Sequence, residues 1–461
     1  MKIFFKNWRV NFILLLIIIA GAVITSRLFF VQVVNHKLYQ SQALGQQVGF
    51  SKVTGSRGQI LCENSQQSKG AYNSGQTKNL ATNKDSWIIS AASDEISDKT
   101  AFAEALSEVI GQTKEEILAE MDGDNYYAVI KKAVSADELN KIKELNLKGL
   151  YWENNPERFY PQGELASQAL GFLGGEGTGQ YGLEGYYEDI LMGKSGIKEE
   201  KRGLDALFSN NNSISLDGSD LYLTIDCNIQ FQAESLLKKQ KEKNDIDSGQ
   251  IIVLKPDSGR ILALANYPSF DLNQYSKEKN LEIFQNSATQ KLFEPGSIFK
   301  PFTMAIALNE NKITPETTYV DTGSVSFGAK TIHNFANEIY GEQTMTQVLE
   351  NSINTGAVFA SQQVSHQTFL NYVDKFGFTK KTGIDLQGEV SSNNNVLRNA
   401  TDMNFATASF GQGIELTPIQ IISGFSAIAN GGRVVKPYLV EKIASGQDEM
   451  EIKPQLSDPV I

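Results

Sequence analysis

The sequence is poor in the residues that build metal sites and disulfide scaffolds. It has two cysteines, Cys62 and Cys227, and its three histidines are scattered without the spacing of metal ligands. Two cysteines are too few for a disulfide framework or a four-cysteine zinc site. The composition therefore disfavours a metal enzyme.

Long runs of Lys or Arg are also missing. The chain carries 42 basic and 53 acidic residues, which gives a net charge of −11, so we expect no nucleic-acid partner. With 41% hydrophobic and 21% charged residues, the chain is too apolar for disorder. Its 461 residues predict two or three domains.

The N-terminal segment has no charge over residues 12–25, after a short basic start. This run is shorter than the roughly 20 residues that cross a bilayer. One alternative is a signal peptide cleaved after Ala22, which ends a stretch of small residues. The apolar pattern continues past Arg27, however, and we favour an uncleaved anchor at residues 10–34. The positive-inside rule then places residues 1–9 in the cytoplasm and the rest of the chain outside.

The next part of the chain has the pattern of a mixed α/β module. Residues 64–79 are polar and without a period, which predicts a surface loop. A strand is predicted at residues 86–92, and helices at residues 99–110 and 136–150. Frequent glycines and aromatics in residues 158–196 predict many turns, which suits a junction between domains.

The composition changes near Asp217, where we expect a second domain to begin. Residues 221–225 alternate as a strand, and residues 228–239 have a helical pattern. Residues 250–254 and 260–265 flank a Lys-Pro-Asp-Ser-Gly turn and predict an antiparallel hairpin. Strands interleaved with helices predict the α/β (α+β) fold class, with a central antiparallel sheet flanked by helices.

The strongest chemical signal is the segment Glu-Pro-Gly-Ser-Ile-Phe-Lys-Pro around Ser297 and Lys300. Pro301 lacks an N–H, which confines it to the first turn of a helix that begins near Ser297. Lys300, three residues on, lies on the same helical face as the Ser297 hydroxyl. This pair has the form of a nucleophile and its base, provided that desolvation or a nearby cation lowers the lysine pKa.

Ser-x-x-Lys alone is a weak motif, and without further context a merely structural role would be favoured. The same spacing recurs in less promising contexts, at Ser195/Lys198, Ser235/Lys238 and Ser276/Lys279.

A second element is Ser352-Ile353-Asn354, which follows an amphipathic stretch at residues 344–350. A hydroxyl and an amide two residues apart can point into one cleft while Ile353 packs away from it. Ser352 would shuttle a proton and Asn354 would hydrogen-bond a substrate amide. The alternative is an ordinary helix cap, for which Ser and Asn are preferred residues.

Together these segments resemble the class B penicillin-binding proteins, the monofunctional peptidoglycan transpeptidases, whose Ser-x-x-Lys and Ser-x-Asn motifs match Ser297/Lys300 and Ser352/Asn354. The resemblance covers nearly the whole chain and implies a membrane-proximal pedestal at residues 35–216 and a transpeptidase domain at residues 217–461. Further landmarks are Arg57-Gly58-Gln59-Ile60, Arg158-Phe159-Tyr160-Pro161, Gly182-Leu183-Glu184, residues 220–230, 249–271 and 409–413, Thr417-Pro418 and Ala429-Asn430-Gly431-Gly432.

Two departures from the family pattern matter. Cys62 and the polar stretch to Asn79 indicate an insertion in the pedestal. The family's third motif, Lys-Thr/Ser-Gly, lies on a strand downstream of the Ala-Asn-Gly-Gly landmark. Lys381-Thr382-Gly383 lies upstream of it and continues as a loop, so we reject it as that motif. We therefore expect a C-terminally truncated domain that lacks its last strands.

The resemblance implies acyl transfer through a covalent intermediate. Ser297 would attack the penultimate D-Ala of a stem peptide, Lys300 would take its proton, and Ser352 would help to protonate the leaving D-Ala. The backbone N–H of Ser297 would be one oxyanion donor. The implied partners are peptidoglycan stem peptides, β-lactams, the membrane through the N-terminal helix, a membrane glycosyltransferase and other division proteins. No metal or organic cofactor is required.

Rival interpretations remain open. A β-lactamase or a penicillin-sensing receptor shares Ser-x-x-Lys but lacks a large pedestal of this kind, and a non-catalytic scaffold of the division complex would fit a chain that ends at Ile461. The 240 residues from Arg57 to Ser297 (297 − 57) favour the septal-division type over the elongation type. The implied location is the cytoplasmic membrane, with a single span and an extracytoplasmic catalytic domain.

Overall fold

The structure is a computed structural model that describes residues 49–68, 71–122, 127–200, 217–392, 394–398 and 401–461, together with Gly21 and Thr25. Contacts divide the chain into two compact units, Met1–Gly55 with Lys194–Leu216, and Ser56–Gly193 with Asp217–Ile461. The predicted tail and anchor at residues 1–34 lie outside the described residues, apart from Gly21 and Thr25. In the described ranges, every helix is too short or too polar to cross a membrane.

In the first unit, β1 (Gly49–Thr54) pairs antiparallel with β10 (Ser195–Glu200). The register runs from Gly49 opposite Glu200 to Thr54 opposite Ser195. Ser195 and Lys198 thus lie on a strand.

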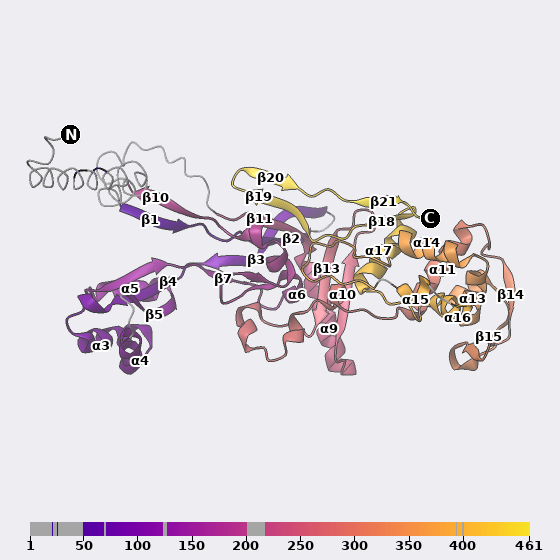
Figure 1. The fold of residues 1–461 in the computed structure, drawn as a ribbon, viewed down its shortest axis with the longest axis horizontal. Coiled ribbons are helices and arrows are strands. Elements are labelled where there is room, and N and C mark those ends of the chain that lie inside the picture. Colours follow the sequence, from indigo (N-terminus) through magenta and orange to yellow (C-terminus); the bar gives the residue numbers. More distant parts are fainter. Residues whose placement is uncertain are drawn as a thin grey trace, which may run out of the picture. The chain divides into compact units, whose positions relative to one another are not determined.

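A six-stranded sheet organises the second unit (Figure 1), in the order β20-β19-β11-β2-β3-β7. Its strands are β2 (Ile60–Ser68), β3 (Ala71–Lys84), β7 (Glu157–Phe159), β11 (Asp220–Asp226), β19 (Val440–Ser445) and β20 (Asp448–Glu451). Only the β11–β2 pair is parallel among these pairings. Strands from both halves of the sequence therefore share one sheet.

The prediction of a surface loop at residues 64–79 is wrong. Residues 64–68 belong to β2 and residues 71–79 belong to β3, with Gln66 opposite Asn73 and Ser68 opposite Ala71. Backbone pairing depends on the register of N–H and C=O groups and needs no alternation of apolar side chains. The polar composition therefore concealed a strand pair.

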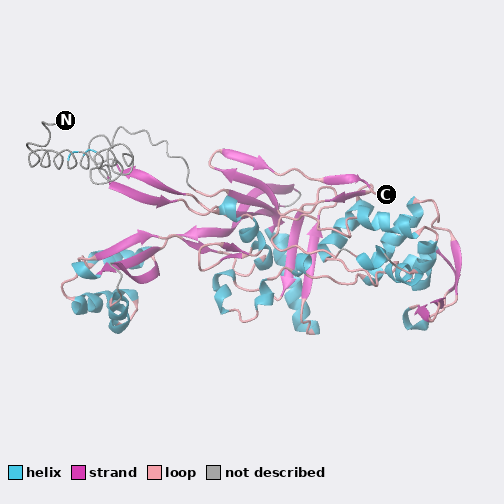
Figure 2. Cartoon of the chain, viewed as in Figure 1, coloured by secondary structure: helices cyan, strands magenta, loops and turns pink. Residues whose placement is uncertain are grey.

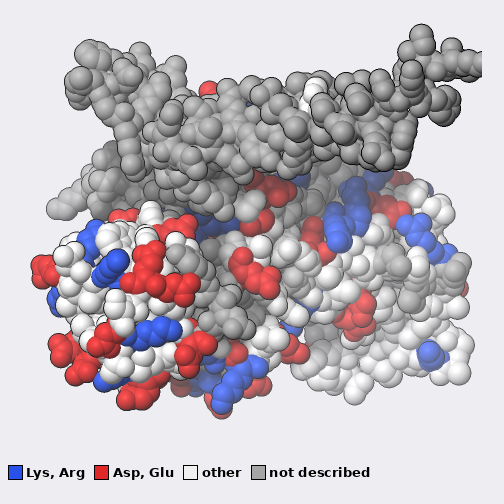
Figure 3. Space-filling model, turned by 60° about the vertical axis from the view of Figure 1, so that its left-hand side comes forward, with Lys and Arg blue, Asp and Glu red and all other residues white. Residues whose placement is uncertain are grey.

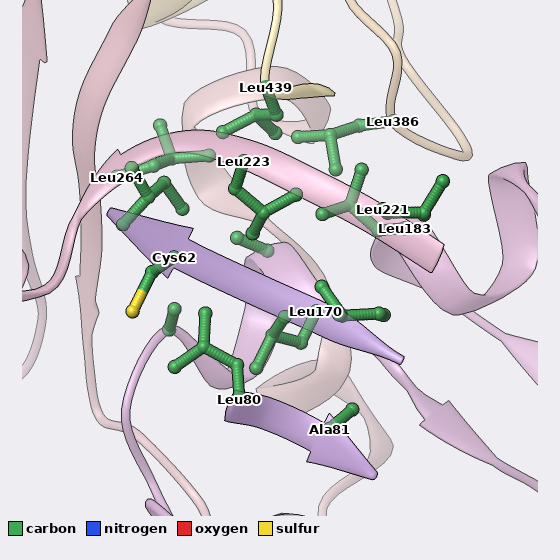
Figure 4. Close-up of a cluster of buried hydrophobic side chains, with 14 of the residues drawn as sticks. Cys62, Leu80, Ala81, Leu170, Leu183, Leu221, Leu223, Leu264, Leu386 and Leu439 are labelled. Carbon is green, nitrogen blue, oxygen red and sulfur yellow. The ribbon is translucent and has the colours of Figure 1, made fainter. Parts of the chain in front are cut away.

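The main hydrophobic core surrounds this sheet (Figure 4). Side chains of β2, β3 and β11 point toward leucines from distant segments, among them Leu170, Leu264 and Leu439. The two cysteines do form one disulfide, between Cys62 on β2 and Cys227, 165 residues away. Segments that lie far apart in the sequence are therefore joined in one core.

A smaller three-stranded sheet has the order β5-β4-β6, and helices cover one of its faces. Its elements are β4 (Trp87–Ala92), α3 (Lys99–Ile110), α4 (Lys114–Met121), β5 (Tyr127–Val134), α5 (Ala136–Glu144) and β6 (Leu150–Asn154). The predicted strand at residues 86–92 and helix at residues 99–110 are confirmed. The helix predicted to reach Leu150 ends at Glu144, because Asn146, directly after the C-cap, adopts a φ of +48° and Leu150 begins a strand.

The region after Asp217 begins as predicted, with β11, then α9 (Cys227–Asn244), then the antiparallel pair β12 (Gly249–Leu254) and β13 (Ile261–Tyr267). Of the expected central antiparallel sheet, the described residues contain the two-stranded pair of β12 and β13. Apolar residues of α9 pack against it, among them Ala233 and Leu237.

Helices form most of the remaining structure, and Figure 2 shows them gathered beyond the β12–β13 hairpin. They are α10 (Ser287–Gln290), α11 (Lys300–Asn309), α12 (Met345–Glu350), α13 (Asn354–Gln362), α14 (His366–Lys375), α15 (Asn395–Arg398), α16 (Asp402–Ala408) and α17 (Pro418–Ala429). Short antiparallel strand pairs accompany them: β14 (Thr318–Asp321) with β17 (Gly341–Thr344), β15 (Ser324–Phe327) with β16 (Lys330–His333), and β18 (Arg433–Val435) with β21 (Leu456–Pro459).

The turn-rich segment at residues 158–196 contains only short elements, as predicted. They are α6 (Ser167–Leu170), β8 (Phe172–Leu173), β9 (Gly179–Gln180), α7 (Gly182–Tyr186) and α8 (Glu188–Leu191), followed by β10.

A buried ionic cluster holds this segment in place. On the face shown in Figure 3, Lys and Arg are interspersed with Asp and Glu at the surface, but the side chain of Glu184 is fully buried. Its carboxylate accepts hydrogen bonds from Arg57 Nε and Arg158 Nε, each at 2.7 Å. Both guanidinium groups are themselves buried, so each charged group in the cluster is stabilised by its oppositely charged neighbours and not by water.

Replacing Glu184 should therefore be costly. We expect Glu184→Gln to lower the free energy of unfolding by about 3 kcal/mol, because it leaves two buried guanidinium groups undercompensated. The matched control is Glu164→Gln, which breaks the half-exposed pair with Lys238 and should cost less than about 1 kcal/mol. Denaturant unfolding of both variants measures the difference, and equal losses would contradict the prediction.

Candidate active site

The Ser-x-x-Lys segment forms one continuous helical stretch. A 3₁₀ turn spans Gly296–Phe299 and α11 follows at Lys300, with Pro301 in its first turn. The backbone N–H of Lys300 donates to the carbonyl of Ser297, so the two residues are one turn apart. Ser297 is exposed. The predicted helix start and the placement of Pro301 are confirmed.

The side chain of Lys300 is buried in spite of its charge. The residue is 1% exposed, and its Nζ donates to the carbonyl oxygen of Ser352 at 2.5 Å and to Ser352 Oγ at 3.0 Å. Burial disfavours the ammonium form and lowers the pKa of Lys300 to about 8. A lysine in this state can accept a proton near neutral pH.

The Ser235/Lys238 pair has a different environment. Lys238 forms a half-exposed ion pair with Glu164, whose hydrogen bond raises the pKa of Lys238. A lysine held in its charged form cannot act as the base for Ser235. Ser276 lies exposed in a 3₁₀ segment, and Ser195 begins a strand. Tertiary burial therefore sets Lys300 apart from Lys238.

Ser352 lies in the turn that ends α12, in a conformation that serine rarely adopts. Its φ is +53°, and its N–H donates to the carbonyl of Leu349, while the N–H of Ile353 donates to that of Val348. These two bonds are those of a Schellman cap, in which glycine usually takes the left-handed position. This backbone conformation costs about 1 kcal/mol, and it places both oxygens of Ser352 against the Lys300 amine.

Ile353 and Asn354 complete the second motif. Ile353 is buried with Val348 in the helical core, as predicted, and Asn354 begins α13. The Asn354 Nδ2 donates to the carbonyl of His333 at 3.0 Å. The alternative, a cap at a helix end, is met by the backbone of Ser352 in the Schellman turn of α12, whereas Ile353 occupies the N-cap of α13 and supplies no side-chain hydrogen bond there.

The segment around Gly411 supports the turn that contains Ser297. The N–H of Gly296 donates to the carbonyl of Gly411 at 2.9 Å, and the N–H of Gly413 donates to Glu294 Oε1 at 2.8 Å. Gly411 has a φ of +79°, and a Cβ there would lie 2.2 Å from the Gly296 oxygen. The sequence presented this glycine only as a landmark, and its contact with Gly296 was not predicted.

Lys381-Thr382-Gly383 lies in a loop and not on a strand, as we expected. The N–H and Oγ1 of Thr382 donate to Glu389 Oε1, and the N–H of Gly383 donates to Oε2. Glu389 is buried, so these bonds satisfy its carboxylate.

A second group of buried polar residues, Asp321, Asn334 and Thr355, lies directly behind Asn354. None of these three residues was predicted from the sequence. Their positions along the chain carried no motif that would have connected them.

Known proteins resemble the chain along most of its length. The family profile described as "Penicillin-binding Protein dimerisation domain" matches residues 52–223, and the profile described as "Penicillin binding protein transpeptidase domain" matches residues 249–459. Stage V sporulation protein D of Bacillus subtilis is 29% identical over 466 residues, which cover 97% of this chain and 69% of that protein. Probable peptidoglycan D,D-transpeptidase PbpC of Pseudomonas aeruginosa is 26% identical, covering 98% of this chain and 78% of that protein.

The fold agrees with these matches. The crystal structure of Penicillin Binding Protein 2X from Streptococcus thermophilus aligns with a TM-score of 0.70 at 22% identity, covering 89% of this chain and 64% of that one. The chain therefore spans about two thirds of the length of that protein and of the Bacillus relative. With both domain profiles in sequence order and relatives that match nearly its full length, the chain belongs to the class B penicillin-binding proteins, the family of peptidoglycan D,D-transpeptidases.

Proposed function

We propose that Ser297 is the nucleophile of this transpeptidase and that Lys300 is its base. The observation that carries the assignment is the burial of Lys300 one helical turn from an exposed serine, with its pKa lowered to about 8. Ser352 contacts the same amine and serves as the proton relay. Asn354, held by the His333 carbonyl, binds an amide of the substrate.

The reaction proceeds by acyl transfer. Ser297 Oγ attacks the carbonyl carbon of the penultimate D-Ala of a stem peptide, and its proton passes to Lys300 Nζ. The C–N bond to the terminal D-Ala breaks, and the leaving amine receives a proton through Ser352. The amine of a second stem peptide then attacks the acyl-enzyme, which forms the cross-link and frees Ser297. The backbone N–H of Ser297 donates to the oxyanion.

β-Lactams are the second class of ligand. Their strained amide resembles the D-Ala-D-Ala terminus, and attack by Ser297 opens the ring and leaves the drug covalently bound. Labelling by a fluorescent penicillin therefore reports the first half of the reaction without a stem peptide.

Ser297→Ala should abolish this labelling in the protein made from its complete gene, because the acceptor oxygen is removed. Ser235→Ala is the matched control, since Ser235 has the same spacing from a lysine that is paired with Glu164. Gel fluorescence after incubation measures both variants. Labelling of a folded Ser297→Ala protein would exclude Ser297 as the nucleophile.

The pKa of Lys300 predicts the pH dependence of acylation. Only the neutral amine accepts a proton, so the acylation rate constant should rise with pH and level off above about 8. Lys300→Ala should acylate at least about a hundredfold more slowly, without a step near that pH. Stopped-flow acylation between pH 6 and 10 tests both statements. A wild-type rate that still rises steeply above pH 10 would show an ordinary lysine.

We further propose that the protein is anchored in the cytoplasmic membrane by residues 10–34, with its N-terminus inside and both domains, residues 35–216 and 217–461, outside. The uncharged run at residues 12–25 supports this, and so does the Cys62–Cys227 disulfide, since such bonds persist in oxidising compartments. The proposed role is septal wall synthesis with a membrane glycosyltransferase and other division proteins.

A fluorescent tag at the C-terminal end tests this topology and role. In spheroplasts, added protease should remove the tag while the cytoplasm stays sealed, and in intact cells the fluorescence should concentrate at the division site. A protected tag would overturn the topology. Even fluorescence along the side wall would overturn the septal role.

A further inference from the structure

Helix α13 begins at Asn354 without a local cap. Its N-cap residue, Ile353, has no polar side chain, so the first N–H groups of the helix need acceptors from elsewhere. The side chain of Asn334 supplies one, because its Oδ1 accepts from the N–H of Thr355 at 3.1 Å. Asn334 lies 21 residues upstream, directly after β16, and is 4% exposed.

Asp321 determines which way the Asn334 amide faces. Asn334 Nδ2 lies 3.0 Å and 2.9 Å from the two carboxylate oxygens of Asp321 and 3.2 Å from the carbonyl of Glu338. With both amide protons directed to these acceptors, the amide oxygen must face Thr355. Asp321 is 2% exposed, and it also accepts from the N–H groups of Gly323 and Tyr340.

Thr355 is also held through its side chain. Its Oγ1 lies 2.6 Å from Asp321 Oδ1, the distance of a charge-assisted hydrogen bond. The Tyr319 hydroxyl lies 3.1 Å from the same Oγ1 and can donate to it. Both the backbone and the side chain of Thr355 are thus bonded to one carboxylate–amide pair.

The neighbouring residue is Asn354. Its Nδ2 bonds the carbonyl of His333, the residue before Asn334. Two consecutive residues at the start of α13 are therefore fastened to two consecutive residues at the end of β16. A shift of Asn334 would move both contacts together.

We propose that Asp321 is a positioning residue for Asn354, acting through Asn334 and Thr355 to fix the amide that meets the substrate. This inference rests on the proposed function of Asn354. Asp321 touches no reacting atom in this arrangement. It orients the Asn334 amide, which caps the helix, and the helix start carries Asn354. A displacement of about 1 Å in such a group costs on the order of a hundredfold in rate.

The experiment compares two β-lactams. Benzylpenicillin carries a side-chain amide, whereas 6-aminopenicillanic acid has the same fused rings and a free amine instead. The ratio of their acylation rate constants reports recognition of the amide. Asn354→Ala should collapse this ratio, and Asp321→Asn should lower it about 10- to 100-fold. Thr355→Val, which removes only the hydroxyl, should lower the ratio by a smaller factor.

A matched control is available on the adjacent hairpin. Thr331→Ala removes a hydroxyl whose contact is with Ser326, and it should leave the ratio at the wild-type value. The exchange Asp321→Asn with Asn334→Asp restores a carboxylate–amide pair with its polarity reversed. It should recover part of the ratio that Asp321→Asn loses.

The outcomes separate the inference from the proposed function. A folded Asp321→Asn protein with the wild-type ratio would overturn the inference, and so would equal losses for both compounds, which indicate a purely structural role. If Asp321→Asn does not fold, an unchanged ratio in Thr355→Val overturns it. Acylation of Ser297→Ala, or a ratio unaffected by Asn354→Ala, would instead overturn the proposed site.

Discussion

The burial of the Lys300 amine is the constraint on which the site depends. A charged amine removed from water must find hydrogen-bond acceptors or lose its proton. Here both oxygens of Ser352 lie against it, and this requires a serine in the left-handed position where α12 ends. The strain in the Ser352 backbone and the lowered pKa of Lys300 thus belong to one arrangement.

The helical core keeps this arrangement rigid. Phe299 and Phe302, on either side of Lys300 in the sequence, pack against Phe378, with ring centroids 5.6 Å and 5.0 Å away. Gly411 lies against Gly296 just before Ser297, and Thr303 Oγ1 donates to the carbonyl of Ser409. Movement of Lys300 toward water would have to disturb these contacts, so its desolvation is maintained by packing.

The core around the six-stranded sheet has a different role. It joins β2 and β3, from early in the chain, to β11 and β19, and the Cys62–Cys227 disulfide crosses the same region. The buried carboxylate of Glu184, shared between two arginines, fastens the turn-rich segment to this core. The candidate site lies in the helical core, whose buried apolar residues form a cluster separate from the one around the sheet.

Local patterns predicted local structure well. The helix at α3 has the 3.6-residue period of a half-buried helix, and the β12–β13 hairpin has a Pro-Asp-Ser-Gly turn, so both were recognisable. The hairpin at residues 64–79 was missed because its strands pair through backbone groups without an apolar alternation. The end of α5 was misplaced because the neighbouring strand β6 takes Leu150, and that competition is tertiary.

The candidate site, like the fold, was predictable from the sequence where it depends on neighbouring residues, and not where it depends on tertiary contacts. The sequence by itself determined that Ser297 and Lys300 share one helical turn, since Pro301 restricts where that helix can begin. It also determined that Ile353 would separate Ser352 from Asn354, because an apolar residue between two polar ones packs away from them. Both conclusions depend only on residues a few positions apart.

Only the tertiary structure decided that Lys300 is buried and Lys238 is not, although both follow a serine at the same spacing. It also brought Ser352 to Lys300 across 52 positions, and Asp321 to Thr355 across 34. The physical reason is that the pKa of a lysine depends on the exclusion of water, and water is excluded by side chains that are remote in the sequence. A motif specifies the groups that can react, and the packing around these groups determines their pKa values and their orientation.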